Sequence, residues 1–141
     1  GIYQAGTLSG NPITMHAGLA TLSMLENNQV YEKLEKSAST LTEGLETLAG
    51  ETGVPFKTNR VGSMFGIFFT KNQRVETYED VLTGNNIFFV NFFKEMLQRG
   101  VYLAPSPFEA GFLSTEHDSE IIATTLNAAK EAFQELARNK I

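Results

Sequence analysis

The sequence predicts a small α+β fold, in which a mainly antiparallel sheet carries helices on one face and a long connecting helix precedes it. Three observations lead to this prediction. Two long segments repeat their apolar residues at alternating steps of four and three, which is typical of amphipathic helices. Short segments rich in Val, Ile and Phe are typical of strands. The predicted order is helix, helix, strand, helix, strand, strand, helix, and runs of this kind give an α+β sandwich.

The composition fits a globular chain of one domain's length, with 141 residues and a hydrophobic fraction of 42%. A net charge of -5 argues against nucleic acid or an anionic membrane as the main partner. No apolar run reaches the roughly 18 residues that a membrane span needs. The absence of cysteine excludes disulfides and thiolate metal sites, and it fits a cytoplasmic location. With only His16 and His117, no metal site is expected, and an isolated His is usually a surface or capping residue.

Residues 1–11 are predicted to form a loop that ends at a helix start. Asn11 suits the N-cap, and Pro12 suits the first helical position, where its missing N–H is not needed. The helix predicted over 13–25 is apolar on nearly every side, so it requires cover from several directions. We expect this helix to connect the chain to further protein.

Two longer helices are predicted over about 30–49 and 118–138. Each has a single apolar stripe, which is typical of a helix lying on a core. The stripes consist of Leu34, Ala38, Leu41, Leu45 and Leu48 in the first helix and of Ile122, Leu126, Ala129, Phe133 and Leu136 in the second. Gly50, Gly53 and Pro55 end the first helix. The candidate caps of the second are Ser114, Thr115 and Asp118.

The middle of the chain is predicted to supply the sheet and one more helix. Residues 60–70 read as one strand with both faces largely covered, and 71–86 as a polar loop or mobile segment. Residues 87–99 carry phenylalanines at helical spacing. Residues 101–106 and 110–114 are predicted to be two short strands.

No segment carries a self-contained catalytic motif such as a nucleophile elbow, a zinc-protease motif or a phosphate-binding Walker loop. The lysines lie off the apolar stripes of the helices or flank a strand, so none is an obvious buried amine of lowered pKa. They are Lys33, Lys36, Lys57, Lys71, Lys94, Lys130 and Lys140.

The stretch AGTLSGN, residues 5–11, allows two interpretations. Gly6 and Gly10 permit tight turns, while Thr7 and Ser9 supply hydroxyl groups. With unpaired N–H groups these side chains would form an anion site suited to a phosphate monoester. Alternatively, the stretch is only a capped helix start with hydroxyl-stabilised turns, and the pattern alone favours that simpler interpretation.

The stretch APSPFEAGF, residues 104–112, places the single carboxylate of Glu109 among aromatic residues in a proline-bounded turn. Such a carboxylate is either the tip of a loop in solvent or a group aimed at a cationic ligand. The pattern alone favours the solvent-exposed tip.

Three stretches, YQAGTLSGNP, VGSMFGIFFT and GVYLAPSPFEAGFLSTEH, carry a family resemblance that extends over essentially the whole chain. Together they resemble the C-terminal part of the glutamate-1-semialdehyde 2,1-aminomutase family, which belongs to the class-III, fold-type-I enzymes that use pyridoxal phosphate. The G-T-x-x-G-N-P element recurs in looser form across the class. The Y-L-A-P-S-x-F-E-A-G-F segment is closer to the aminomutases.

The resemblance implies that the cofactor is pyridoxal 5'-phosphate or pyridoxamine 5'-phosphate and that the enzyme is a homodimer. In the family the Schiff-base lysine precedes the region matched here, so we expect residues 1–29 to end a large domain and 30–141 to form the C-terminal small domain. The chain alone would be inactive. Gly6 and Thr7 match the loop that holds the phosphate of the other subunit's cofactor.

The resemblance also implies a small-molecule substrate, glutamate-1-semialdehyde, which is converted to 5-aminolevulinate for tetrapyrrole synthesis. Glu109 matches a glutamate that faces the active site, where it would attract and orient substrate amines. Ser106 is a weaker candidate for the same site. Two alternatives are a class-III aminotransferase with an external amino donor and a stand-alone α+β binding module.

Overall fold

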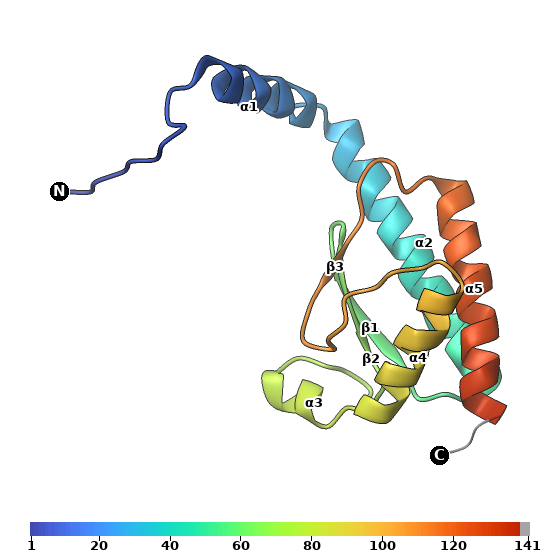
Figure 1. Ribbon diagram of the computed structural model, residues 1–141. Coiled ribbons are helices and arrows are strands. Elements are labelled where there is room, and N and C mark those ends of the chain that lie inside the picture. Colours follow the sequence, from blue (N-terminus) through green and yellow to red (C-terminus); the bar gives the residue numbers. More distant parts are fainter. Residues whose placement is uncertain (139–141) are drawn as a thin grey trace.

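The computed structural model describes residues 1–138, so Lys140 and the end of the expected small domain lie outside it. Its helices are α1 (Pro12–Leu25), α2 (Asn28–Thr52), α3 (Tyr78–Leu82), α4 (Asn86–Gln98) and α5 (Ser119–Arg138) (Figure 1). Its strands are β1 (Lys57–Val61), β2 (Met64–Phe68) and β3 (Gly111–Phe112). The sheet is antiparallel in the order β1–β2–β3, with α2, α4 and α5 on one side. This architecture confirms the predicted α+β fold.

The segment 60–70 was expected to be one strand and is instead part of a β-hairpin. Gly62 and Ser63 form its two-residue turn, and Val61 pairs with Met64. Gly62 adopts a positive φ of 57°, which glycine tolerates without steric strain. Because side chains alternate along a strand, the hairpin buries Phe65 and leaves Val61 largely exposed. The prediction of two covered faces was therefore wrong.

The core lies between the sheet and the layer of α2, α4 and α5. Phe92 of α4 and Phe133 of α5 are almost completely buried, with ring centroids 4.7 Å apart. Phe56 approaches Phe133 at 5.1 Å in an edge-on arrangement, a favoured geometry for aromatic pairs. Ala38 and Ala129, which belong to the predicted stripes, are fully buried and let α2 and α5 pack closely.

The helix ends follow the capping rules. Asn27 caps the start of α2, and Gly53, in the left-handed conformation with φ 72°, ends it. The helix runs through Gly50 and is longer than the predicted 30–49. Of the three candidate caps for α5, Asp118 accepts hydrogen bonds from the backbone N–H groups of Glu120 and Ile121, both at 3.0 Å.

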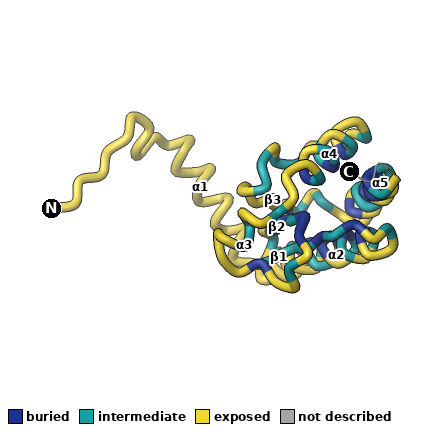
Figure 2. Tube along the Cα trace, turned by 90° about the horizontal axis from the view of Figure 1, so that it is seen from below, coloured by how far each residue is buried: buried dark blue, intermediate teal, exposed yellow. Residues whose placement is uncertain are grey.

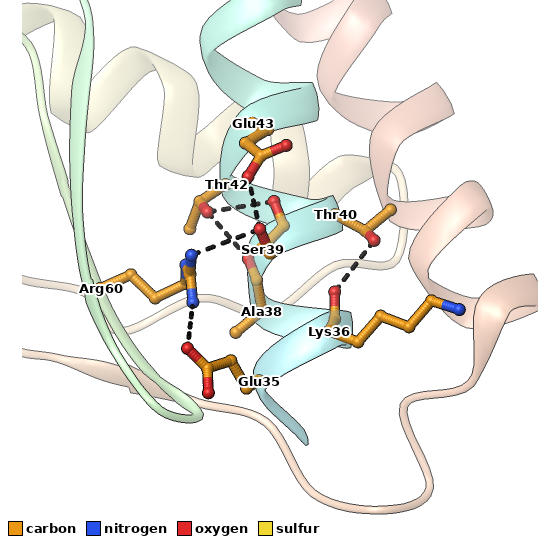
Figure 3. Close-up of polar contacts among 8 residues, drawn as sticks. All are labelled: Glu35, Lys36, Ala38, Ser39, Thr40, Thr42, Glu43 and Arg60. Atoms are coloured by element: carbon orange, nitrogen blue, oxygen red, sulfur yellow. Dashed lines mark hydrogen bonds and ion pairs between the residues drawn. The ribbon is translucent and has the colours of Figure 1, made fainter. Parts of the chain in front are cut away.

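A polar cluster joins β1 to the first half of α2 (Figure 3). The Arg60 guanidinium donates to a carboxylate oxygen of Glu35 and to the hydroxyl of Ser39, both at 3.3 Å. Ser39 in turn donates to the Glu43 carboxylate. Exposed ion pairs contribute little stability, so the cluster mainly orients the hairpin on α2.

The N-terminal part of the chain does not pack on this core. Every residue from 1 to 29 is exposed, and α1 projects away from the rest of the fold (Figures 1 and 2). The exposed apolar side chains of α1 include Ile13, Met15, Leu19, Leu22 and Met24. The stand-alone module hypothesis required this helix to be covered by the chain's own sheet, and it is not. Among residues 1–138, no helix has the length and hydropathy that a membrane span requires.

One predicted loop and two predicted strands also differ from the structure. The segment 71–86 contains the short helix α3, whose start carries a complete capping box between Thr77 and Asp80. Residues 101–106 make no strand, and only Gly111 and Phe112 of the predicted 110–114 strand pair with β2. Pro105 and Pro107 lack the N–H that a ladder needs, which explains the irregular backbone between α4 and β3.

Candidate functional site

The N-terminal stretch forms two overlapping turns directly before α1. The Ser9 N–H donates to the Gly6 carbonyl at 3.0 Å, and the Asn11 N–H donates to the Leu8 carbonyl at 3.1 Å. Gly10 adopts a positive φ of 76°, which permits the second turn. A Cβ atom on Gly6 would lie 3.1 Å from the hydroxyl of the exposed Ser9, which would have to move slightly.

The turn leaves donors unused. The N–H and hydroxyl of Thr7 make no hydrogen bond within the described residues, and the side chain is exposed. By contrast, the Asn11 side chain already accepts from the first free N–H groups of α1, those of Ile13 and Thr14. An anion here would therefore be held by the turn around Thr7 and the Ser9 hydroxyl more than by the helix end. Closely spaced donors of this kind suit a phosphate monoester.

The second candidate stretch places Glu109 at the end of a tight turn. The Glu109 N–H donates to the Ser106 carbonyl at 3.2 Å, and the Phe108 N–H donates to the Ser106 hydroxyl at 3.2 Å. The Ser106 hydroxyl thus accepts from a backbone N–H two residues further on, which is typical of a hydroxyl-stabilised turn. The Glu109 carboxylate is exposed and has no hydrogen-bond or ion-pair partner within residues 1–138.

Glu109 lines two cavities, one on each face of the sheet. The core-side cavity, with a volume of about 270 Å³, is also lined by Phe65 and Ile67 of β2. The outer cavity, about 240 Å³, is also lined by Gly66 and Phe68. These two pairs alternate along β2 and therefore point to opposite faces. Glu109 therefore lies at the sheet edge between the two cavities, and it is exposed, as a loop tip would be.

His117 also lines the core-side cavity, although the sequence indicated only a surface or capping residue. Its ring Nδ1 accepts a hydrogen bond from the Ser114 N–H at 3.0 Å, which places the ring proton of the neutral form on Nε2. The Lys33 amine donates to the Thr115 carbonyl at 2.7 Å, and the Ser37 hydroxyl donates to the His117 carbonyl at 3.2 Å. His117 therefore does act as a turn-capping residue before α5.

The structure does not bring Thr7 and Glu109 together. No residue of 1–11 lines either cavity, and both views place this segment away from the sheet (Figures 1 and 2). One copy of the chain therefore cannot bring both side chains to the same small ligand in this arrangement. The assignment of Gly6, Thr7 and Glu109 as site residues stays a prediction.

None of the six lysines within residues 1–138 is buried. Lys33 is held by the Thr115 carbonyl, and Lys57 is the least exposed, being only partly covered at the start of β1. A lysine that acts as a nucleophile is normally desolvated or placed beside another cation. The described lysines do not have that environment.

Comparison with solved structures identifies longer proteins that contain this fold. An omega-transaminase from Sphaerobacter thermophilus matches with a TM-score of 0.77 and 26% identity, over 98% of this chain and 31% of that chain. The FumI protein of Sphingopyxis sp. MTA144 matches with a TM-score of 0.77 and 25% identity, over 98% and 30% of the two chains. This chain thus spans less than a third of the proteins it matches.

A glutamate-1-semialdehyde-aminomutase from Pseudomonas aeruginosa PAO1 has a TM-score of 0.78 and 21% identity, over 96% of this chain and 30% of that chain. At that identity the match shows a shared fold only. Among family models, the one described as aminotransferase class-III matches residues 2–113, which is most of the chain. This chain therefore belongs to the class-III aminotransferase family.

Proposed function

We propose that the protein carrying this chain is an aminomutase that converts glutamate-1-semialdehyde to 5-aminolevulinate, with residues 30–141 as its small domain. One observation carries the proposal. The Y-L-A-P-S-x-F-E-A-G-F segment, which resembles the aminomutases, holds the unpaired Glu109 carboxylate at a sheet edge between two cavities. Supporting it, the family membership implies a transamination-type reaction.

The cofactor proposed is pyridoxal 5'-phosphate, or its pyridoxamine form, both of which carry a phosphate monoester. Solved structures of the same fold are described as having PLP or PMP bound. The donors around Thr7 fit the phosphate, because its hydroxyl and N–H are unused within residues 1–138. When bound, the cofactor supplies the electron sink that lets an amino group move between carbons. The described lysines supply no buried amine, so another part of the polypeptide would hold the cofactor's aldehyde.

Thr7 would act on the cofactor of a second subunit, and the protein would be a homodimer. The position of residues 1–11 away from the sheet supports this arrangement, because one copy could contribute Thr7 and the other Glu109 to the same site (Figure 1). The exposed apolar side chains of α1 also indicate an interface, which a longer polypeptide or a second subunit would bury. A cytoplasmic location stays a prediction.

Glu109 would hold and orient the amino groups of the substrate. A carboxylate attracts an ammonium group, and that attraction would become stronger if the bound substrate excluded water from the carboxylate. Held this way, the diamine intermediate, which carries amines on neighbouring carbons, would stay bound and oriented until the second amine is transferred. A positioned charge therefore suits a reaction in which both amine donor and acceptor are parts of one molecule.

An aminotransferase with an external amino donor is the second candidate. The observation that favours it is the identity with the omega-transaminase, 26%, against 21% with the aminomutase. Both candidates need the same cofactor, so cofactor binding does not separate them.

The test is turnover of glutamate-1-semialdehyde by the full-length protein in its pyridoxamine form, without any added amino donor. The aminomutase proposal expects 5-aminolevulinate to accumulate over many turnovers. A single turnover that continues only after alanine or another amino donor is added would identify an aminotransferase. Glu109→Gln, which keeps the side-chain size and removes the charge, is expected to lower kcat/KM by about tenfold or more.

A further inference from the structure

We infer that α3 positions the Glu109 carboxylate and that the helix does so through the side chain of Tyr78. This inference rests on the proposed function, since that function gives the carboxylate its role. The Tyr78 ring lies 5.8 Å from the Phe108 ring, centroid to centroid, at an interplanar angle of 41°. Such a distance is typical of attractive aromatic pairs. Phe108 directly precedes Glu109, so the contact restrains the turn that carries the carboxylate.

The helix that carries Tyr78 is held firmly, although five residues are too few to form a stable helix alone. Before it, Val75 is 5% exposed, and its carbonyl accepts from the Asn59 side chain of β1 at 2.6 Å. After it, the Asn85 N–H donates to the Phe69 carbonyl, at the end of β2, at 2.7 Å. The segment that contains α3 is thus attached to the sheet on both sides of the helix.

The Glu109 turn has little support of its own. Its two hydrogen bonds, both accepted by Ser106, lie within the turn and do not attach it to the sheet. The outer cavity lies beside it, lined by Phe108 and by Val81 of α3. We expect that, without the Tyr78 ring, the turn can shift and carry Phe108 and Glu109 with it. The Tyr78 ring, which also lines this cavity, would oppose that movement.

If Tyr78 only stabilised the fold, its removal would lower the thermal midpoint. If it positions Glu109, its removal would lower the rate at an unchanged midpoint. Tyr78 is 63% exposed and Phe108 is 52% exposed, so their contact buries little area. Tyr78→Ala is therefore expected to change the thermal midpoint by no more than about 2 °C. A larger effect on catalysis would then come from the site, and the cycle below tests whether it acts through Glu109.

The first test is a double-mutant cycle in the full-length enzyme with glutamate-1-semialdehyde as substrate. Tyr78→Ala is expected to lower kcat/KM by about tenfold. Tyr78→Ala combined with Glu109→Gln is expected to be no slower than Glu109→Gln alone, because Tyr78 acts only through the carboxylate. Effects that multiply would overturn the inference. Tyr78→Phe is expected to retain the wild-type rate.

Leu82→Ala is the matched control, because Leu82 lies on the same short helix, is 56% exposed and lines neither cavity. It is expected to leave both the rate and the thermal midpoint unchanged. A loss of rate equal to that of Tyr78→Ala would mean that α3 acts by general packing, which would overturn the assignment to Tyr78.

The second test is a crystal structure of the full-length Tyr78→Ala variant beside that of Tyr78→Phe. We expect a displaced Phe108 ring and a displaced Glu109 carboxylate in the alanine variant only. An unmoved turn would overturn the inference whatever the activities are. If instead the turn moves while Glu109→Gln keeps full activity, the proposed role of Glu109 fails and the positioning role of Tyr78 stands.

Discussion

Gly111 of β3 lies so close to the ring of Phe65 that a Cβ atom built on Gly111 would fall 2.4 Å from the ring's Cζ atom. Phe65 belongs to the core and is 7% exposed. The contact sets how near β3 can lie to β2 and brings the Glu109 turn to the sheet edge. Glycine at position 111 thus allows the close pairing of β3 with β2 that places the Glu109 turn at the sheet edge.

Gly111→Ala is expected to destabilise the protein by about 1–3 kcal/mol, because the added methyl group forces a buried ring to move. Gly50→Ala is the control: Gly50 lies inside α2 with nothing within 4 Å of an added Cβ. That change is expected to stabilise the helix by about 0.5–1 kcal/mol. Urea unfolding of the two variants measures both values, and a neutral Gly111→Ala would show that Phe65 adapts freely.

Glu46 of α2 caps the free edge of the sheet. Its Oε1 atom accepts from the Thr58 N–H at 2.8 Å and from the Thr58 hydroxyl at 2.7 Å. Glu46→Ala is expected to lower the free energy of unfolding by about 1–2 kcal/mol, because a partly buried edge N–H loses its acceptor. Glu51→Ala, at an exposed position of the same helix, should change it by less than about 0.5 kcal/mol. Equal losses in the two variants would contradict a specific role for Glu46.

Asp80 makes the attachment of α3 sensitive to acid. Hydrogen bonds from the backbone N–H groups of Glu76 and then Thr77 lower the pKa of Asp80 from its ordinary value. A carboxyl group with a lowered pKa stabilises the fold above its unfolded pKa, and this contribution is lost as the pH falls through the folded value. The difference in stability between wild type and Asp80→Asn is therefore expected to stay constant near neutral pH. It should shrink below about pH 4.

Thermal unfolding from pH 2.5 to 7 would measure this difference. Asp118→Asn is a useful comparison, since Asp118 also accepts two backbone N–H groups but caps α5 and not α3. A difference in stability between wild type and Asp80→Asn that grows as the pH falls would contradict this expectation.

The sequence correctly predicted the buried faces of the amphipathic helices. The stripes of α2 and α5 are confirmed because residues such as Ala38 and Ala129 repeat at the helical period and meet only one neighbouring layer. The all-round hydrophobicity of α1 correctly indicated a helix that this chain does not cover. These features depend on local spacing alone.

The remaining features depend on contacts between distant segments. The turn at Gly62 and Ser63 lies inside an apolar run, so composition suggested one strand where pairing produces two. The position of Glu109 between two cavities requires β2 and β3 to meet. The contact of its turn with Tyr78 joins two segments that α4 separates in the sequence. A capping signal, Thr77 followed three residues later by Asp80, was the one local sign of α3.

Thr7→Val tests the phosphate assignment, since valine keeps the shape of threonine and removes its hydroxyl. We expect the full-length protein to retain pyridoxal 5'-phosphate about tenfold less tightly, because a charge-assisted hydrogen bond is lost while the backbone donors remain. Thr7→Ser, which keeps the hydroxyl, should retain the cofactor nearly as well as wild type. Dialysis followed by the visible absorption of the bound cofactor measures retention in each variant.

Because Thr7 is exposed and unpaired within residues 1–138, neither change should alter the stability of the cofactor-free protein. Unchanged retention in Thr7→Val would mean that the Thr7 hydroxyl does not hold the phosphate.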